Sequence, residues 1–272
     1  MITKIICPTD CSSVANNAIE YAAKLAQIFN VELQLLNIQD LATVELARTG
    51  EYLSDDIMST PEVLNNTCGE INKIFSIPCS YVTETNTDSL QEAITKKAGG
   101  SNLIVIGTNG VDDLHQYFFG TNTFNVIKKA NCPVLLVPEN AKYAKVKKII
   151  FAWDYNSQNK LSLSQLGEFI SVFHPKTVLL HISKQKTEIG QDVFRALKNE
   201  ILSHLKKQTD IEFERVYSDD ISSSINDYMN KSKSDMLAIT FYDRGIIRNL
   251  FHNVVMKKLS ETAEFPILVL HV

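Results

Sequence analysis

Glycine and hydroxyl residues between positions 107 and 123 have a spacing that suits the binding of a phosphate group. The two clusters, separated by nine residues, are Gly107-Thr108-Asn109-Gly110 and Gly120-Thr121-Asn122-Thr123. Because glycine has no Cβ, Gly107 and Gly110 allow main-chain N–H groups to approach a bound group closely. At a helix start near Gly120, unpaired N–H groups and the helix dipole favour an anion. The pattern predicts a phosphate site, although glycines that only allow turns would give a similar sequence pattern.

A second group of candidate residues follows the first two apolar segments of the chain. Pro8, Thr9 and Asp10 end the first segment, and Ile38 ends the second. Asp10 can accept hydrogen bonds from ribose hydroxyls or from an adenine amine, and it can also cap the first helix; the two roles are compatible. Ile38 is expected either against the edge of a base or in the core.

These candidates are positioned by an alternation of short apolar strands and amphipathic helices. Strands are expected at 3–8, 32–38, 78–84, 102–107 and 133–137, and helices at 12–29, 41–75 with an interruption at 59–61, 88–98 and 121–130. Such an alternation predicts an α/β fold with a parallel, doubly wound sheet and right-handed crossovers. Ligands of these sheets bind beyond the carboxyl ends of the strands, where both groups of candidates lie.

The chain contains the same unit twice. Four apolar segments recur in order: Lys4–Asp10 as Lys148–Asp154, Leu35–Ile38 as Leu179–Ile182, Asn102–Ile106 as Asp235–Ile239, and Pro133–Val137 as Pro266–Leu270. The first two matches are offset by 144 residues and the last two by 133. We therefore expect two domains, 1–140 and 141–272, the second of them shortened between its second and third strands.

Composition agrees with a globular protein. Of 272 residues, 44% are hydrophobic and 21% are charged, and no apolar run approaches the roughly 18 residues of a membrane-spanning helix. The first residues lack the features of a signal peptide, and five cysteines form no zinc pattern, so we expect buried, reduced thiols in a cytoplasmic protein. The net charge is −4, divided as −8 over 1–140 and +4 over 141–272, which does not indicate a nucleic-acid partner.

Signatures of known catalytic sites are absent from the sequence. It contains no Gly-x4-Gly-Lys-Ser/Thr loop, no Gly-x-Gly-x-x-Gly, no Gly-x-Ser-x-Gly and no His-Glu-x-x-His. His181 follows an apolar strand and is expected to be a hydrogen-bonded, buried side chain. No general base is indicated beside the glycine motif, so we expect a binding protein without catalytic or metal-ligating residues rather than an enzyme.

The spacing Gly107-x2-Gly110-x9-Gly120-Thr121 resembles the motif of the ATP-binding universal stress proteins, and both halves together resemble their tandem form. The resemblance implies two Rossmann-like domains of the adenine nucleotide alpha hydrolase type, each a five-stranded parallel sheet with helices on both faces. It implies that the ligand is ATP, ADP or AMP, and that Asp10 and Ile38 lie at the adenosine. Whether Mg²⁺ accompanies the nucleotide is not decided by the resemblance. It also implies pairing through the last strands, which here are Val134–Val137 and Ile267–Leu270.

This chain departs from the family pattern in both halves. The nine residues inside the motif lack the usual basic residues and contain Asp112 and Asp113, which repel a triphosphate unless they point away or a magnesium ion intervenes. The second-half counterparts of the motif residues are Thr240, Asp243, Asn253 and Val254. Although Asp154 matches Asp10, we expect no equivalent nucleotide site there. Arg244 and Arg248 are read as solvent-facing helix residues, with another anion as the alternative.

The preferred interpretation is a regulatory module of the stress response. In it, the first domain holds an adenine nucleotide, and occupancy changes an interaction with an unknown protein partner, while the second domain serves pairing or partner binding. Neither nucleic acid nor a membrane is expected as a partner, and a further homodimer is left open. The alternatives are a slow Mg²⁺-dependent ATP hydrolase and a scaffold that has lost nucleotide binding.

Overall fold

The computed structural model describes residues 2–40, 60–86, 89–99, 102–108, 122–153, 160–183, 210–241, 258–259 and 263–271, with isolated residues between 192 and 203. The chain divides into two compact units, Met1–Tyr143 and Ala144–Val272. Each unit is a parallel sheet with helices on its faces, as the alternating pattern predicts.

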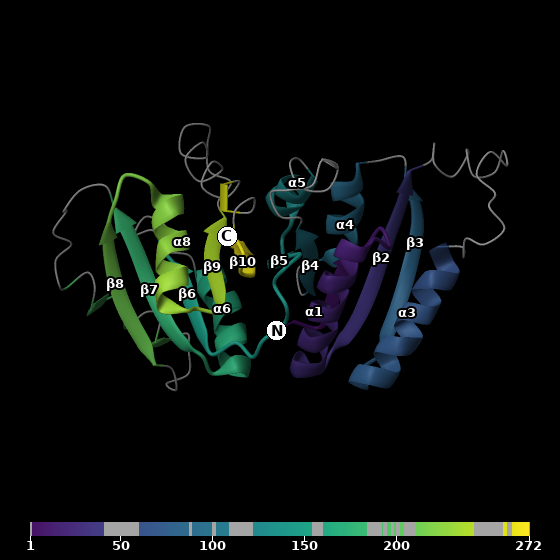
Figure 1. Ribbon diagram of the computed structural model, residues 1–272, viewed down its shortest axis with the longest axis horizontal. Helices are drawn as coiled ribbons and strands as arrows, with labels where there is room; N and C mark the ends of the chain where they lie inside the picture. The colour runs from purple at the N-terminus through teal and green to yellow at the C-terminus, as the bar shows by residue number, and fades with distance from the viewer. Residues whose placement is uncertain are drawn as a thin grey trace. The chain divides into compact units, whose positions relative to one another are not determined.

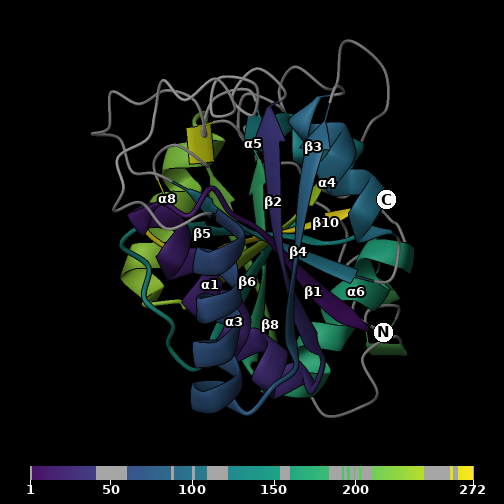
Figure 2. The ribbon, with the colours of Figure 1, turned by 90° about the vertical axis from the view of Figure 1, so that its right-hand side faces the viewer.

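The first unit contains five parallel strands in the order β3-β2-β1-β4-β5. Its elements are β1 (Lys4–Pro8), α1 (Ser13–Phe29), β2 (Glu32–Asp40), α3 (Thr60–Phe75), β3 (Cys79–Asn86), α4 (Leu90–Ala98), β4 (Asn102–Thr108), α5 (Asn122–Lys129) and β5 (Val134–Pro138). Helices α1 and α3 lie on one face of this sheet and α4 and α5 on the other (Figures 1 and 2). The order reverses direction after β3, which places the switch point between β1 and β4.

The second unit repeats this topology, with strand order β8-β7-β6-β9-β10. Its elements are β6 (Lys148–Ala152), α6 (Lys160–Phe173), β7 (Lys176–Ser183), β8 (Ile211–Tyr217), α8 (Ile221–Ser232), β9 (Met236–Phe241) and β10 (Ile267–His271). Strand β6 corresponds to β1, and β9 corresponds to β4. Right-handed crossovers therefore place α6 and α8 on opposite faces of this sheet.

Pairs of residues that lie opposite each other on neighbouring strands recur between the units. The equivalent pairs are Lys4–Glu32 and Lys148–Lys176, Leu33–Cys79 and Thr177–Ile211, and Ile104–Val134 and Leu237–Ile267. The offset of 144 residues holds through β7, falls to 132 at the first residue of β8, and is 133 in β9 and β10. The predicted repeat and its shortening between the second and third strands are confirmed.

Helix α1 begins and ends where its residues favour a change of backbone direction. The Ser12 hydroxyl accepts a hydrogen bond from the Ala15 N–H at 3.2 Å, and Asn30 ends the helix in the left-handed region with φ of 55°. Between these ends, Ala22 and Leu25 are fully buried against the sheet. The helix expected at 12–29 is therefore present, with Ser12 as its cap residue.

One strand end at the candidate site differs from expectation. Strand β2 continues to Asp40, so Ile38 lies within the strand, opposite Glu84 of β3, rather than after its end. The ladder with β3 provides main-chain partners as far as Asn86, which explains the extension. Helix α3 begins at Thr60 with Pro61 in its first turn, within the interruption expected at 59–61. The helical segment expected from position 41 up to that interruption lies outside the described residues. Among the helices that the structure describes, none has the length and apolar character to cross a membrane.

Candidate functional site

The carboxyl ends of β1, β2 and β4 meet at one edge of the first sheet. The Thr9 N–H donates to the Leu36 carbonyl at 2.9 Å, which extends the β1–β2 ladder one residue past Pro8. On the other side, the Glu139 N–H donates to the Thr108 carbonyl at 2.7 Å. The predicted residues Thr9 and Thr108 therefore end two adjacent strands at the switch point, where the topology places ligands.

Asp10 lies in a tight turn between β1 and α1. Its carboxylate Oδ1 accepts the Ser12 N–H at 2.9 Å, and the Thr9 Oγ1 accepts the Cys11 N–H at 3.0 Å. Cys11 has a φ of 64°, which reverses the chain toward the helix. The expected capping role thus belongs to Ser12, while Asp10 is exposed and its carboxylate retains capacity to accept further hydrogen bonds.

Asn37 joins the ends of β1 and β2 and was not among the residues predicted from the sequence. Its side chain is 5% exposed, and its Nδ2 donates to the Thr9 carbonyl at 2.9 Å. Its Oδ1 is buried without a hydrogen-bond partner among the described residues, as is the Oγ1 of Thr83, which lies opposite Asn37 on β3. A polar residue inside the apolar run Leu35–Ile38 was the available signal.

The second unit has the same contact with a different side chain. His181, the counterpart of Asn37, donates from Nδ1 to the carbonyl of Trp153, the counterpart of Thr9, at 3.1 Å. A carbonyl can only accept, so Nδ1 carries the proton in this arrangement. The prediction that His181 is a buried, hydrogen-bonded side chain is confirmed.

Aromatic rings in the second unit replace the small residues at the corresponding sheet edge. Trp153 stands where the first unit has Thr9, Phe241 where it has Thr108, and His271 where it has Pro138. The Trp153 and His181 rings have centroids 6.3 Å apart, and those of Phe241 and His271 are 5.9 Å apart. All four side chains are buried, so rings occupy the space that is lined by small side chains in the first unit.

The glycine motif is described only at its two ends. Gly107 lies in β4 and Thr108 ends that strand, while Asn122 begins α5 and Thr123 is buried in its first turn. In the second unit, Thr240 occupies the register position of Gly107. The remaining candidates lie outside the described residues: Asn109, Gly110, Asp112, Asp113, Gly120, Thr121, Asp154, Asp243, Arg244, Arg248, Asn253 and Val254.

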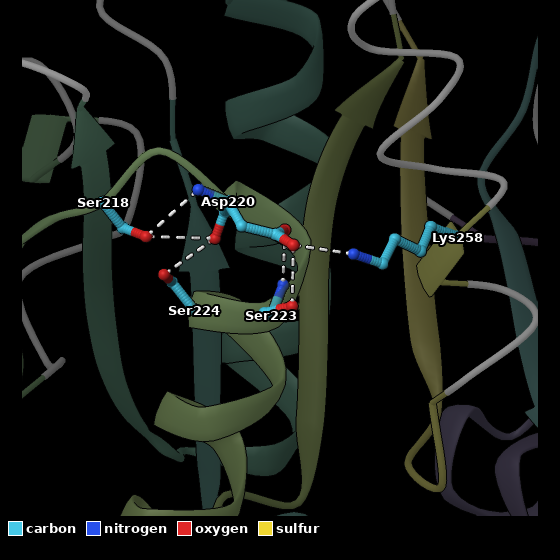
Figure 3. A network of polar contacts seen from close by, with 5 residues as sticks. All are labelled: Ser218, Asp220, Ser223, Ser224 and Lys258. Atoms are coloured by element: carbon cyan, nitrogen blue, oxygen red, sulfur yellow. Dashed lines mark hydrogen bonds and ion pairs between the residues drawn. The ribbon is translucent and has the colours of Figure 1, made fainter.

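In the second unit, the N-terminus of α8 is capped by the side chain of Asp220. Asp220 accepts the Ser223 N–H at 3.0 Å and Lys258 Nζ at 2.8 Å, and the Asp220 carbonyl accepts the hydroxyls of Ser218 and Ser224 (Figure 3). The hydrogen bond from Lys258, followed by those from Ser223, holds the pKa of this carboxyl well below its ordinary value. The cluster therefore stabilises the start of the helix.

All five cysteines are free thiols in the structure. Burial raises the pKa of Cys7 and of Cys132 to about 12, so neither forms a thiolate readily. Cys11 and Cys79 are partly exposed, which corrects the expectation that every thiol is buried. Among the described residues, no group of three or more His, Cys, Asp or Glu side chains forms a metal site.

Comparison with known proteins identifies the family. The model of the universal stress protein family matches residues 1–138, which include the whole glycine motif. The chain belongs to the universal stress protein family. A universal stress protein of Methanocaldococcus jannaschii is 30% identical over 149 residues, which cover 51% of this chain and 84% of that protein.

Two solved structures resemble this universal stress protein over nearly its whole length. A universal stress protein from Archaeoglobus fulgidus matches with a TM-score of 0.74 and 13% identity, covering 98% of this chain and 97% of that one. A putative universal stress protein from Pseudomonas aeruginosa matches with a TM-score of 0.65 and 17% identity, covering 99% and 93%. At such identities the likeness establishes the fold, which is the predicted Rossmann-like α/β class.

Proposed function

We propose that this universal stress protein is a cytoplasmic regulatory module that binds an adenine nucleotide in its first unit. The proposal rests on where the structure places the first and last residues of the glycine motif. Gly107 and Thr108 stand at the carboxyl end of β4, Thr123 lies in the first turn of α5, and the exposed Asp10 follows the neighbouring strand β1. A phosphate chain above β4 would meet main-chain N–H groups, and the adenosine would extend toward Asp10 and Ile38.

The second unit serves partner binding rather than nucleotide binding in this proposal. Three positions at its sheet edge carry the rings of Trp153, Phe241 and His271, and Thr240 replaces a motif glycine. In this proposal, these larger side chains fill the positions at which the first unit has small residues, and so exclude a nucleotide from the second unit. One nucleotide per chain is therefore the expected stoichiometry.

Binding without efficient hydrolysis is the expected activity. The sequence contains none of the hydrolase signatures that supply an activated water. Nucleotide occupancy would then act by stabilising the first unit and the loops around its ligand. Binding of ATP, ADP and AMP should be measured separately, each with and without Mg²⁺. The three nucleotides differ in the length of the phosphate chain that the glycine motif would hold.

The test is the change in melting temperature on adding millimolar ATP and Mg²⁺. We expect a rise for the native protein and none for Gly110→Val or Gly107→Thr, each of which adds side-chain atoms at the motif. Threonine is suited to the strand at position 107, because Thr240 holds the same register in β9. Thr240→Gly is the matched control in the second unit and should keep the full rise.

Three outcomes would contradict this proposal. An unchanged rise in both glycine variants would show that the motif does not hold the nucleotide. Phosphate release by the native protein above the level of Gly110→Val would show hydrolysis at this site instead of binding alone. A rise abolished by Thr240→Gly but kept by Gly107→Thr would place the nucleotide in the second unit.

A further inference from the structure

Two cysteines of the first unit lie in direct contact, away from the sheet edge that carries the nucleotide motif. Cys68 is on α3, Cys79 is the first residue of β3, and their Sγ atoms are 3.1 Å apart. Strand β3 begins at the opposite end of the sheet from the carboxyl ends of β1 and β4. The pair therefore lies apart from the proposed nucleotide site.

Hydrogen bonds near both cysteines hold the contact in place. Asn72, one helical turn after Cys68, accepts the Cys79 N–H through its Oδ1 at 2.9 Å. The end of α3 is anchored to α1, because Gln27 Nε2 donates to the Phe75 carbonyl at 2.8 Å. Ser76 then reverses the chain with a φ of 54°, so that the strand returns directly beneath the helix. The two sulfurs are thus brought together by the ordered packing of α3 on β3.

The pair is chemically distinct from the other thiols. The hydrogen bond donated by Cys79 lowers the pKa of Cys68, although burial opposes the shift, and the same bond raises the pKa of Cys79. Burial alone raises the pKa of Cys7 and Cys132 to about 12. Cys11 is partly exposed, and burial together with Asp10 raises its pKa as well. Cys68 is therefore the thiol whose environment favours the reactive thiolate among the five.

We propose that Cys68 and Cys79 form a redox-active dithiol site that takes small hydroperoxides as its substrate. With hydrogen peroxide, the Cys68 thiolate attacks one peroxide oxygen, the O–O bond breaks, and the released hydroxide takes up a proton from solvent to leave as water; an organic hydroperoxide would release the alcohol in its place. The Cys79 sulfur then attacks the resulting sulfenic acid at Cys68. The S–S bond forms, the S–O bond breaks, and the hydroxyl leaves as a second water with the Cys79 proton. Two thiols are oxidised and one peroxide is reduced.

The geometry suits a small oxidant and an internal second step. Cys68 is 5% exposed, whereas its partner Cys79 is partly exposed, so the proposed substrate is a small molecule that approaches from the side of Cys79. Once the sulfenic acid forms, the second sulfur is already in contact, so closure of the disulfide precedes further oxidation. The product joins α3 covalently to the start of β3, and a thiol reductant restores the dithiol.

The test is oxidation of the full chain by a stoichiometric amount of hydrogen peroxide, without nucleotide. Thiols are counted under denaturing conditions, and the oxidised protein is digested and mapped by mass spectrometry. We expect two of the five thiols to be lost first, as a reducible link between the peptides that contain Cys68 and Cys79. Cys68→Ser and Cys79→Ala should each abolish the link, whereas Cys132→Ser should retain it at the native rate.

Cys11 serves as the reference within the same molecule, because it is partly exposed but has no sulfur partner among the described residues. A rate of loss at Cys68 and Cys79 at least tenfold above that at Cys11 supports the site. Equal or faster loss at Cys11, a link between other cysteines, or oxygen addition at Cys68 without a link to Cys79 would overturn it.

Discussion

Replacement of Asn37 by aspartate tests the contact that joins the ends of β1 and β2 at the candidate site. The two side chains have nearly the same shape, so packing is preserved and only the chemistry changes. The Asn37 Nδ2 donates to the Thr9 carbonyl at 2.9 Å, and the side chain is buried. In the Asn37→Asp variant, an oxygen that can only accept faces this carbonyl whenever the new carboxyl is ionised.

The expected loss follows from burying an unpaired charge. Removal of one partner from a buried charged contact destabilises a protein by about 3–5 kcal/mol, and we expect a loss of this order for Asn37→Asp at neutral pH. For a protein of this size, this corresponds to a fall of roughly 6–20 °C in the melting temperature of the first unit. Burial raises the pKa of the new carboxyl above its unfolded value of about 4, so the loss shrinks as the pH falls toward that value.

Calorimetry at neutral pH and at about pH 4 measures the loss of stability in Asn37→Asp and its decrease in acid. Asn37→His is one control, because His181 makes the same contact in the second unit and keeps the donor. Thr83→Val is the other control, since it removes a buried oxygen without a partner and should leave stability unchanged or raised. A variant Asn37→Asp that melts within about 2 °C of the native protein at neutral pH would refute the reasoning, because the contact would then carry no such burial penalty.

Two further predictions concern the ends of α8. Lys233 ends this helix with a φ of 48°, so Lys233→Gly should stabilise the second unit by about 1 kcal/mol, measured by urea unfolding; a loss of stability would contradict the left-handed assignment. The lowered pKa of Asp220 means that its charge stabilises the folded state above pH 3.8 and that this contribution disappears as the pH falls further. The stability difference between the native protein and Asp220→Asn should therefore shrink in acid, and a constant difference between neutral and acidic melting curves would exclude a role for the charge.

The fold could be predicted from the sequence because its determinants are local and repeated. Apolar runs such as Leu103–Ile106 indicated buried strands, and matching segments at offsets of 144 and 133 indicated two copies of one topology. The register of Lys4 with Glu32 and of Lys148 with Lys176 confirms that alignment. Strand ends were less accurate, as at Asp40, because the neighbouring strand determines how far the ladder continues.

The candidate site could be predicted only where a motif marks it. Gly107, Thr108 and Asp10 lie at the strand ends where the topology argument expected them. Asn37 was missed because a single polar residue in an apolar strand does not reveal its partner. Its contact with Thr9 depends on which residues the parallel register brings together.

Periodicity and spacing along the chain determined by themselves the repeated α/β architecture and the difference between Gly107 and Thr240, because both depend on residue type and local order. Tertiary structure decided which side chains of distant segments touch. It brought Cys68 against Cys79 and placed two pairs of aromatic rings, tilted against each other, at the corresponding sheet edge of the second unit. Such contacts arise only when helices pack on strands in a particular register, and the free energy of that packing is shared among many residues rather than recorded at any one position.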